Sequence, residues 1–333
     1  MKDITDYSLL THNTFGIDAR CARFLEYTSD DEARQVAAIL RSTAQPFLII
    51  GAGSNLLLTR DFPGTVVHSA VRGFSIDGCR VTCGSGEVWD DVVSQTLDCQ
   101  LYGAENLSLI PGDVGASAVQ NIGAYGAEVK DFIREVHAVE IATGQSCVIP
   151  AAECRYGYRQ SRFKQEWRDR YLITRVVYEF SSVFQPRLDY GNIRAELDRR
   201  GIAQPTAQAL RQVIIDIRRQ KLPDPQEQGN AGSFFMNPVV SRQQYEQLAV
   251  RYPDMPHYSV DADHEKIPAG WLIEQCGWKG SSLGRAGVHS RQALVLVNLG
   301  GATGREILTL CNYIQADVCE KFGIVIFPEV NIV

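Results

Sequence analysis

The stretch from Leu109 to Glu128 constrains this chain most, because Gly112, Gly115, Gly123 and Gly126 are interleaved there with small residues. Without a Cβ atom, such backbone leaves N–H groups open to a bulky or anionic ligand. The run lacks the strand-then-helix periodicity of a nucleotide fingerprint. Two tight turns flanking a short helix explain the same glycines without any ligand. The stretch therefore admits a structural and a ligand-binding interpretation.

A second glycine loop favours the ligand-binding interpretation. Gly51-Ala52-Gly53-Ser54-Asn55 follows directly on the apolar run Phe47–Ile50, which is typical of a buried strand. The third glycine of a dinucleotide fingerprint is missing, so we reject a Rossmann cofactor site at this loop. Two glycine loops of this kind, here called glycine cradles, indicate a long ligand that has phosphate groups in its middle and a planar ring at one end.

Composition excludes several classes of protein. The 333 residues suffice for two or three domains, and 45% apolar with 22% charged residues is typical of a soluble globular chain. The net charge of −6 argues against a nucleic-acid or acidic-membrane binder. No apolar run approaches the ~20 residues of a membrane span, and the first residues have no signal core. Nine cysteines without a C-x-x-C pair fit a reducing cytoplasm, and six scattered histidines predict no metal site.

Local signals predict a mixed α+β chain. Ser29 with Glu32 and Thr303 with Glu306 are capping boxes, and Asp77-Gly78 is a hairpin signal. We expect helices near 88–99 and 206–219, and strands at 47–50, 135–141, 171–180, 293–297 and 324–327. The proline-rich run Lys221–Pro225 ends the second of these helices and is the best candidate for a domain boundary.

Ser233 is the first candidate for chemistry. It lies in the glycine-bracketed loop Gly229–Pro238, between small residues and the aromatic pair Phe234-Phe235, which predicts an apolar, partly dry hydroxyl. No G-x-S-x-G elbow is present, which weakens an acyl-transfer interpretation. A serine there could be a nucleophile with a nearby base, a proton donor, or simply a turn residue.

Arg159 and Glu329 are the other candidates. Arg159 stands among Tyr156, Tyr158 and Arg155, where it could grip a carboxylate by a two-point fork or lie on tyrosine rings at the surface. Glu329 follows the last apolar run, where it is either a partly buried carboxyl or an ordinary strand-end glutamate. None of the three decides the function alone.

Taken together and in order, these residues resemble the UDP-N-acetylenolpyruvoylglucosamine reductase family. The resemblance covers nearly the whole chain, with Tyr190-Gly191 similar to the tyrosine loop of the larger family type. Asp113 and Met236 depart from the family pattern, which leaves fine ligand contacts open. The motifs that carry the resemblance are Asn13-Thr14-Phe15, Gly51–Asn55, Ile110-Pro111-Gly112, Gln120–Gly126, Tyr158-Arg159, Lys221–Pro225, Gly229–Phe235 and Pro328-Glu329-Val330.

The resemblance implies an α+β FAD-binding fold of the vanillyl-alcohol-oxidase (PCMH) type with a C-terminal α+β substrate domain. It implies FAD-binding subdomains at 1–67, to which 320–333 return, and at 68–215, and a substrate domain at 216–319. FAD would be held non-covalently, with its pyrophosphate on the two glycine loops and its ring near 120–126. The implied cofactor residues are Gly51, Gly53, Ser54, Asn55, Ile110, Pro111, Gly112, Gly115, Ser117, Gln120, Asn121, Ile122, Gly123 and Tyr125.

The resemblance also implies the reaction. NADPH would reduce the flavin, and reduced flavin would give hydride to C3 of UDP-N-acetylglucosamine enolpyruvate, forming UDP-N-acetylmuramate for peptidoglycan synthesis. By family position, Ser233 would protonate C2, while Arg159 and a protonated Glu329 would stabilise the enolate charge. Tyr190, Lys221 and Asn237 would hold the UDP part of the substrate. We expect no metal, no nucleic-acid or membrane partner, and a monomer.

Two other functions compete with this one. A different flavin oxidase of the same fold would need the glycine cradles but not Ser233 together with Arg159 and Glu329. A non-enzymatic nucleotide-sugar binder would explain the acidic composition and the loops but not a flavin cradle. The visible spectrum of the purified protein separates a flavoprotein from such a binder.

Overall fold

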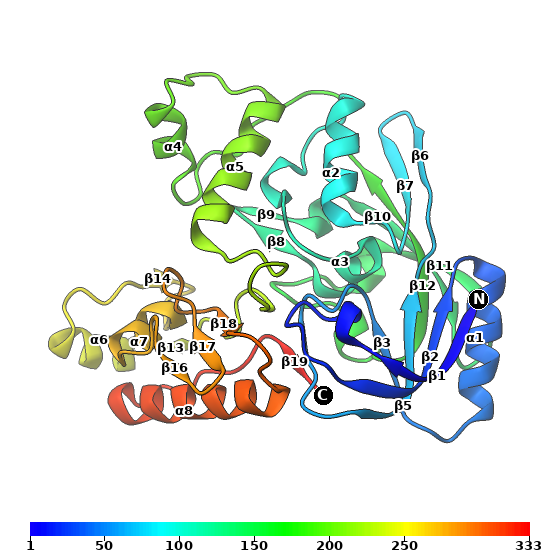
Figure 1. Cartoon of the computed structure of the whole chain (residues 1–333). Coiled ribbons are helices and arrows are strands. Elements are labelled where there is room, and N and C mark those ends of the chain that lie inside the picture. The colour runs from blue at the N-terminus through cyan, green and yellow to red at the C-terminus, as the bar shows by residue number, and fades with distance from the viewer. The chain divides into compact units, whose positions relative to one another are not determined.

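The computed structural model describes residues Met1–Val333, which form two compact units made of interleaved segments (Figure 1). The first unit contains Met1–Tyr7, Cys21–Ala52 and Pro63–Gln220. The second contains Ser8–Arg20, Gly53–Phe62 and Lys221–Val333. The chain thus passes into the second unit three times, and the loop 51–55 is shared between them. The predicted division of the chain into two FAD-binding subdomains and a substrate domain, with boundaries at 67, 215 and 319, stays a prediction.

A four-stranded sheet opens the first unit, in the order β1-β2-β5-β3. Its strands are β1 (Lys2–Ser8), β2 (Arg20–Tyr27), β5 (Phe62–Ser69) and β3 (Phe47–Ile50), the last two parallel. Helix α1 (Asp30–Ser42) begins where the Ser29 hydroxyl accepts the Glu32 N–H at 3.2 Å, which is one half of the predicted capping box. The Glu32 carboxylate accepts the N–H of Thr28, at 2.7 Å, and not that of Ser29. Its apolar stripe packs on Leu25, Val67 and Leu172 in one buried cluster.

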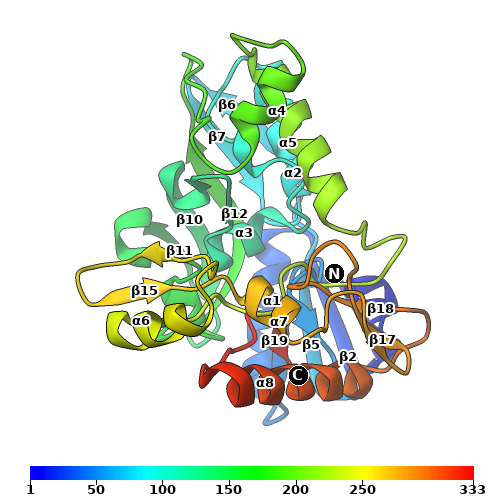
Figure 2. The same ribbon diagram turned by 90° about the vertical axis from the view of Figure 1, so that its left-hand side faces the viewer.

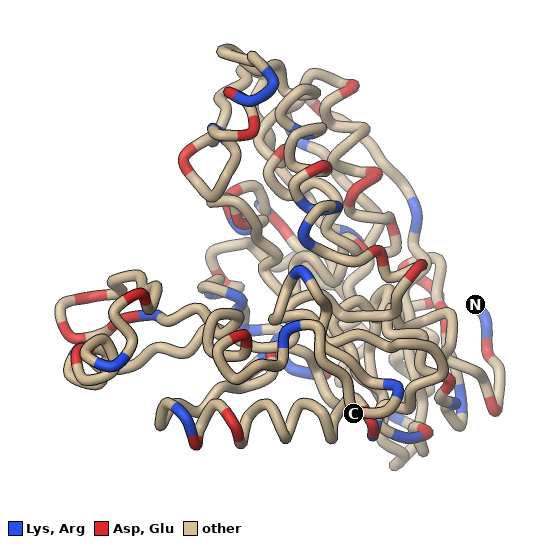
Figure 3. Tube along the Cα trace, turned by 60° about the vertical axis from the view of Figure 1, so that its left-hand side comes forward, with Lys and Arg blue, Asp and Glu red and all other residues tan.

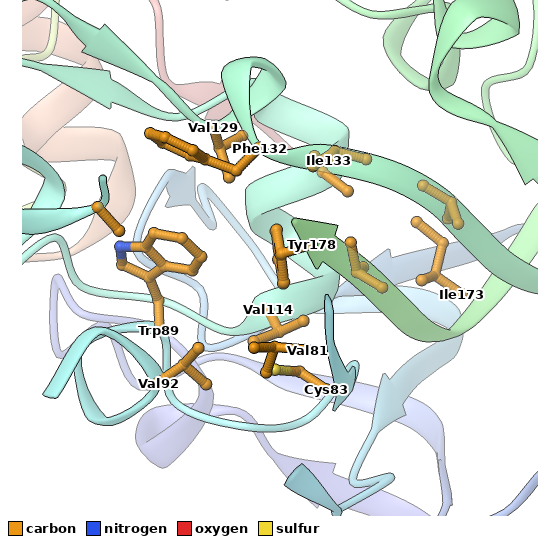
Figure 4. Packing of buried hydrophobic residues seen from close by; sticks show 14 of the residues in the cluster. Val81, Cys83, Trp89, Val92, Val114, Val129, Phe132, Ile133, Ile173 and Tyr178 are labelled. Atoms are coloured by element: carbon orange, nitrogen blue, oxygen red, sulfur yellow. The ribbon is translucent and has the colours of Figure 1, made fainter. Parts of the chain in front are cut away.

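The second sheet of this unit is antiparallel, in the order β11-β10-β12-β7-β6. The hairpin predicted at Asp77-Gly78 is present, with Gly78 at φ +58°. Trp89 and Tyr178 meet edge to face in the main core on this sheet (Figure 4). The strands are β6 (Phe74–Asp77), β7 (Arg80–Gly84), β10 (Ile133–Glu140), β11 (Ser146–Pro150) and β12 (Tyr171–Glu179).

Four helices and a small hairpin complete the first unit. Along α5, Leu210, Val213, Ile214 and Ile217 form the buried stripe that the sequence predicts. Arg211 of this helix binds Asp90 of α2 through two N–O contacts of 2.7 and 3.0 Å, and the two helices lie side by side (Figures 1 and 2). The elements are α2 (Trp89–Asp98), α3 (Val114–Gln120), α4 (Ile193–Arg199), α5 (Ala207–Lys221), β8 (Gly123–Ala124) and β9 (Ala127–Glu128).

The second unit is built on α8 (Gly304–Phe322), which packs against β17 and β18. The Thr303–Glu306 capping box is formed, and Gly323 ends the helix at φ +65°. A parallel pair joins Asn331 with Leu56 and Ile332 with Leu57. The elements are β4 (Leu56–Leu57), β13 (Val239–Ser241), α6 (Arg242–Arg251), β14 (Tyr258–Ser259), β15 (His264–Lys266), α7 (Ala269–Gln275), β16 (Ser282–Leu283), β17 (Ala286–Val288), β18 (Leu296–Asn298) and β19 (Asn331–Ile332).

Two strand predictions in this unit are wrong in detail. The strand expected at 293–297 is β18, and it begins only at Leu296. The segment 324–327 alternates buried isoleucines with exposed Val325 and Phe327, as a strand would, but forms no ladder. It pairs only locally, where the Met236 N–H donates to the Phe327 carbonyl at 2.9 Å. Alternation reports burial on one side, and a ladder also requires a continuous partner.

Charged residues of both signs are interspersed in each unit (Figure 3). None of the helices combines the length and apolarity of a transmembrane span. No group of three or more His, Cys, Asp and Glu side chains is arranged to hold a metal ion. All nine cysteines are thiols, and burial raises the pKa of the Cys83 thiol to about 12.

Candidate functional site

The two predicted glycine cradles meet in the first unit. A Cβ atom built on Gly51 would lie 3.1 Å from the Cβ of Ala116 and 3.2 Å from Oδ2 of Asp113. The loop after β3 therefore lies close to the start of α3, and a side chain at position 51 would need Ala116 or Asp113 to shift slightly. The glycine pattern predicts two loops for one ligand, and the structure brings Gly51 of the first loop close to Asp113 and Ala116 of the second.

The stretch 109–128 forms a short helix between turns, as its structural interpretation predicts. Leu109, Asn121 and Tyr125 have left-handed backbone conformations there. Asn121 is fully buried, and its amide nitrogen donates to the Gly157 carbonyl at 2.7 Å and to Glu128 at 2.9 Å. Its side chain thus holds the turn, which leaves the backbone of the turn as the part available to a ligand.

Ser117 is likewise occupied within the unit. Its hydroxyl donates to the Val114 carbonyl at 2.7 Å and lies 2.9 Å from the hydroxyl of buried Tyr178. Burial holds the pKa of Tyr178 well above its ordinary value, so this phenol stays a neutral hydrogen-bonding partner. The predicted contact of Ser117 with a cofactor stays a prediction.

Arg159 is fixed on the same stretch. Its Nη1 donates to the Asn121 carbonyl at 3.4 Å, and its Nη2 donates to the Gly123 carbonyl. A Cβ atom on Gly123 would lie 2.8 Å from Nη1 and 2.9 Å from the Ala127 carbonyl, and because the carbonyl is backbone, a glycine is favoured here. Arg159 itself has φ +53°, a left-handed conformation that costs a non-glycine residue free energy and is common at functional sites.

Tyr190 also lies against this stretch. A Cβ atom on Gly126 would come within 3.4 Å of the Cβ of Tyr190, and Gly191 stands beside the ring of Tyr125. Tyr190 is 60% exposed, in the irregular segment that the sequence predicts before α4. Arg159, Tyr125 and Tyr190 therefore gather around residues 121–126.

Sequence reasoning missed Arg218 at this place. Its pKa is lowered by burial, and the residues that act on it electrostatically are Tyr125, Asp90 and Arg159. Its Nε atom is buried without a hydrogen-bond partner. The signal in the sequence is its position four residues after Ile214, on the apolar stripe of α5, where a charged side chain needs an explanation.

Ser233 and Glu329 are neighbours through the backbone of the second unit. The Glu329 N–H donates to the Phe234 carbonyl at 2.8 Å, and Asn55 donates to the Glu329 carbonyl at 3.3 Å. The side chain of Ser233 is exposed, whereas the sequence predicts a partly dry hydroxyl. The difference arises because Phe234 and Phe235 both turn into the core, at 0% and 1% exposure, and direct the serine outward.

The loop that carries Ser233 is held by Asn230. Buried Asn230 accepts the Gly232 N–H at 2.9 Å and donates to the carbonyls of Gln228 and Pro223. The Thr14 hydroxyl donates to the Asn230 carbonyl at 2.6 Å. The backbone before Ser233 therefore has fixed partners on both sides.

The predicted substrate residues of the second unit are more peripheral. Asn237 accepts the Ala269 N–H at 2.9 Å and so caps α7, which leaves its amide nitrogen outside that bond. Lys221 is exposed at the end of α5. The structure thus places Arg159, Tyr125 and Tyr190 together in the first unit, and Ser233, Glu329 and Asn55 together in the second.

Comparison with known proteins decides the family. A model described as "UDP-N-acetylenolpyruvoylglucosamine reductase, C-terminal domain" matches residues 224–333. Curated UDP-N-acetylenolpyruvoylglucosamine reductases are 52% identical in Bacteroides fragilis and 47% in Paraburkholderia xenovorans, over 98% of this chain and at least 96% of each relative. The chain belongs to the UDP-N-acetylenolpyruvoylglucosamine reductase family. It is therefore an oxidoreductase of this class.

The cofactor and the fold agree with this reductase family. A model described as "FAD binding domain" matches residues 22–149, which include Gly51 and the stretch 109–128, so FAD is the cofactor. The crystal structure of a UDP-N-acetylenolpyruvylglucosamine reductase from Thermus caldophilus shares the fold, with a TM-score of 0.68 at 22% identity over 99% of this chain and 98% of that chain. The close approach of Gly51 to α3 fits such a cofactor, because side-chain-free backbone lies along both loops.

Proposed function

We propose that this chain catalyses the NADPH-dependent reduction of UDP-N-acetylglucosamine enolpyruvate to UDP-N-acetylmuramate, a step in peptidoglycan precursor synthesis. The observation that carries the proposal is identity of 43–52% along essentially the full length of curated reductases, including a relative in Flavobacterium johnsoniae. The nine thiols support action in the reducing cytoplasm. We expect a monomer.

The chemistry that bound FAD supplies is hydride transfer, from NADPH in one half-reaction and to C3 of the enolpyruvyl group in the other. The second transfer saturates one carbon of the double bond and leaves negative charge on C2, conjugated with the substrate carboxylate. The protein must stabilise that charge with groups already in position, because reorganising them during the reaction would raise the barrier. It must then deliver one proton to C2.

Arg159 and Glu329 are the groups proposed to stabilise the charge. The two bonds from Arg159 to backbone carbonyls hold the guanidinium in place before any substrate arrives. Glu329 is half-buried, and its backbone is paired with Phe234.

Ser233 is the proposed proton donor to C2. Its exposed hydroxyl stands on a loop that Asn230 and Thr14 fix, so the donor is presented at a defined position. Tyr190, Lys221 and Asn237 are proposed to hold the UDP part of the substrate. Tyr190 is largely exposed and packs with one edge against Gly126, which suits a residue that closes over a ligand.

The residues proposed to hold FAD lie on the two glycine loops. Gly51 and the start of α3 already touch, and this contact supports a shared role for the two loops in one cofactor. The full set is Gly51, Gly53, Ser54, Asn55, Ile110, Pro111, Gly112, Gly115, Ser117, Gln120, Asn121, Ile122, Gly123 and Tyr125.

Separate measurement of the two half-reactions tests the function. Purified protein is mixed anaerobically with NADPH, and loss of the flavin band near ~450 nm reports reduction. The enolpyruvyl substrate is then added, and return of the band with formation of UDP-N-acetylmuramate by mass spectrometry is expected. Reduction by NADPH without reoxidation by this substrate would instead indicate a different flavin oxidase. A colourless protein that still binds UDP-sugars would indicate a binding protein.

A further inference from the structure

A histidine and two carboxylates form a partly buried charged cluster beside the first glycine loop, and Asp113 is its buried member. His68 lies in β5, beside Ile50 of β3. Its Nδ1 is 2.9 Å from Oε2 of Glu26 in β2, and its Nε2 is 3.5 Å from Oδ2 of Asp113 at the start of α3. The imidazole therefore bridges the four-stranded sheet and the helix on which Gly51 rests.

Asp113 is the member of the cluster that reaches the loop. The residue is 8% exposed, and its Oδ2 atom makes no hydrogen bond within the protein. The same oxygen would lie 3.2 Å from a Cβ atom on Gly51. A carboxylate oxygen thus stands directly behind the backbone of the proposed pyrophosphate cradle.

This placement creates an electrostatic problem for an anionic ligand. A carboxylate beside a pyrophosphate repels it, and the repulsion is strong where burial limits screening. The charged groups around His68 are Glu26 and Asp113, and Lys2 is 4.0 Å from Glu26 on the outer side. The imidazolium is the only cation of this cluster between the two carboxylates, so its proton decides whether the cluster carries one net negative charge or two.

We propose that His68 is a positioning residue of the FAD site, whose protonated form compensates Asp113 and is required for tight binding of the cofactor pyrophosphate. The inference rests on the proposed placement of FAD on Gly51–Asn55 and Ile110–Gly115. It adds Glu26, His68 and Asp113 to the residues that determine FAD affinity, although the histidine lies under the loop and acts through Asp113.

The direction of the effect follows from linkage. Burial opposes a charged imidazole, but contacts with Asp113 and Glu26 outweigh it and raise the pKa of His68 above its ordinary value. The proton is therefore lost as pH rises through this raised pKa. FAD affinity falls over the same interval, and bound FAD in turn raises the pKa of His68 by the matching factor.

Titration of the apoprotein with FAD, followed by flavin fluorescence between pH 6 and pH 8.5, tests the proposal. The dissociation constant of the wild type is expected to rise about tenfold over this range, which corresponds to a pKa change of one unit in His68. His68→Gln should bind FAD about tenfold more weakly at pH 6 and lose most of the pH dependence. Asp113→Asn should bind FAD at least as tightly as wild type, with a flattened profile.

His137→Gln is the matched control, because His137 also lies 3.3 Å from a glutamate, Glu135, but in β10 at the surface. It should retain the wild-type profile. The proposal is overturned if the wild-type dissociation constant does not change with pH, or if Asp113→Asn keeps the full pH dependence. Thermal unfolding of each apoprotein shows whether His68→Gln weakens FAD binding directly or through a folding defect. If His68→Gln is poorly folded, the pH profile of Asp113→Asn tests the proposal in its place. Failure of the proposed reaction would appear differently, as absence of reoxidation by substrate with FAD binding intact.

Discussion

At the scale of single residues, Gly51 and Gly123 stand where another group approaches the backbone closely. A Cβ atom on Gly123 would meet the Ala127 carbonyl and the Arg159 guanidinium, and one on Gly51 would crowd Ala116 and Asp113 at the start of α3. A glycine-rich loop can thus affect ligand binding through the side chains that pack against it. We therefore expect substitutions at Gly51 and Gly123 to alter ligand binding by moving Asp113 and Arg159.

The first prediction concerns Ser233. Ser233→Ala keeps the small size of an exposed residue, so the fold and FAD content should persist. Reduction by NADPH should proceed at close to the normal rate, because that half-reaction uses no proton on C2. Reoxidation by the enolpyruvyl substrate should slow by about 10²-fold or more, the usual effect of removing a general acid. Rapid-mixing absorbance of the flavin measures both rates.

Ser233→Cys is the companion variant for this experiment. A thiol can also donate a proton, so part of the reoxidation rate should return. Reoxidation of Ser233→Ala as fast as the wild type would show that another group protonates C2. A covalent adduct on wild-type Ser233 in mass spectra would identify a nucleophile instead.

The second prediction concerns Tyr190. Tyr190→Phe keeps the stem that packs against Gly126, so thermal stability should not change. Loss of the hydroxyl should weaken substrate binding by about three- to tenfold, the net value of one hydrogen bond. Equilibrium titrations with substrate and with NADPH measure the two affinities separately. Equal losses for both ligands would argue against a substrate lid.

Residue roles differ in how far sequence alone can predict them. Arg159, Ser233 and Glu329 stand in motifs whose neighbours are adjacent in the chain, so their resemblance to a family is visible. The cluster of His68 with Glu26 and Asp113 joins three elements, and no local pattern announces it. The sequence shows that Arg218 is a charged residue on an apolar helix stripe. It does not show that Tyr125, from a distant loop, lies near it.

At the scale of elements, α5 is held by a charged clamp as well as by its apolar stripe. The guanidinium of Arg211 binds both oxygens of Asp90, and the Leu109 N–H also donates to this carboxylate. The clamp therefore joins α5, α2 and the beginning of the stretch 109–128. Both side chains are mostly buried, which makes the loss of one partner costly.

Asp90→Asn should lower the free energy of unfolding by roughly 2 kcal/mol at neutral pH. Burial raises the pKa of Asp90, but the bonds from Arg211 and Leu109 outweigh it and hold the pKa below its ordinary value. This stabilisation is present above the unfolded-state pKa of about 4 and is lost as pH falls through the folded-state pKa. Denaturant unfolding of both proteins from pH 7 to pH 3 should show the difference shrinking below about pH 4. A constant difference across that range would contradict the clamp.

Helices were predictable at this scale because their signals are local. Ser29 with Glu32 and Thr303 with Glu306 cap α1 and α8 within four residues of chain. The segment 324–327 has the alternation of a strand but lacks a continuous partner, and a sequence pattern does not report partners. Pairing of Leu56 with Asn331 was likewise beyond local reasoning.

At the scale of the whole molecule, the two units interleave along the chain rather than follow one another. The second unit includes Ser8–Arg20 and Gly53–Phe62, which come from the N-terminal part of the sequence. Gly229 and Gly304 pack so tightly that a Cβ atom would lie 2.1 Å from the Phe15 carbonyl and 1.8 Å from the Leu58 carbonyl. The N-terminal segments are therefore built into the core of the second unit.

The fragment 1–220 should consequently fail to fold as a stable FAD domain. Phe15, Leu57 and Leu58, at 0–1% exposure in the full chain, would lose the partners that cover them. We expect the fragment to aggregate in size-exclusion chromatography and to bind FAD poorly. Co-expression with 221–333 should restore a soluble yellow complex. A monomeric fragment with full-length FAD affinity would show that the interleaved segments are dispensable.

The pairing of Leu56 with Asn331 has a consequence for biosynthesis. When Leu56 leaves the ribosome, its partner strand has not been translated, and at about 5–20 residues per second it arrives only after tens of seconds. Throughout that interval Leu56 and Leu57 lack the strand with which they pair in the complete protein. Nascent chains of this enzyme should therefore depend on holding chaperones that bind near residue 57 and leave when the last strand is made.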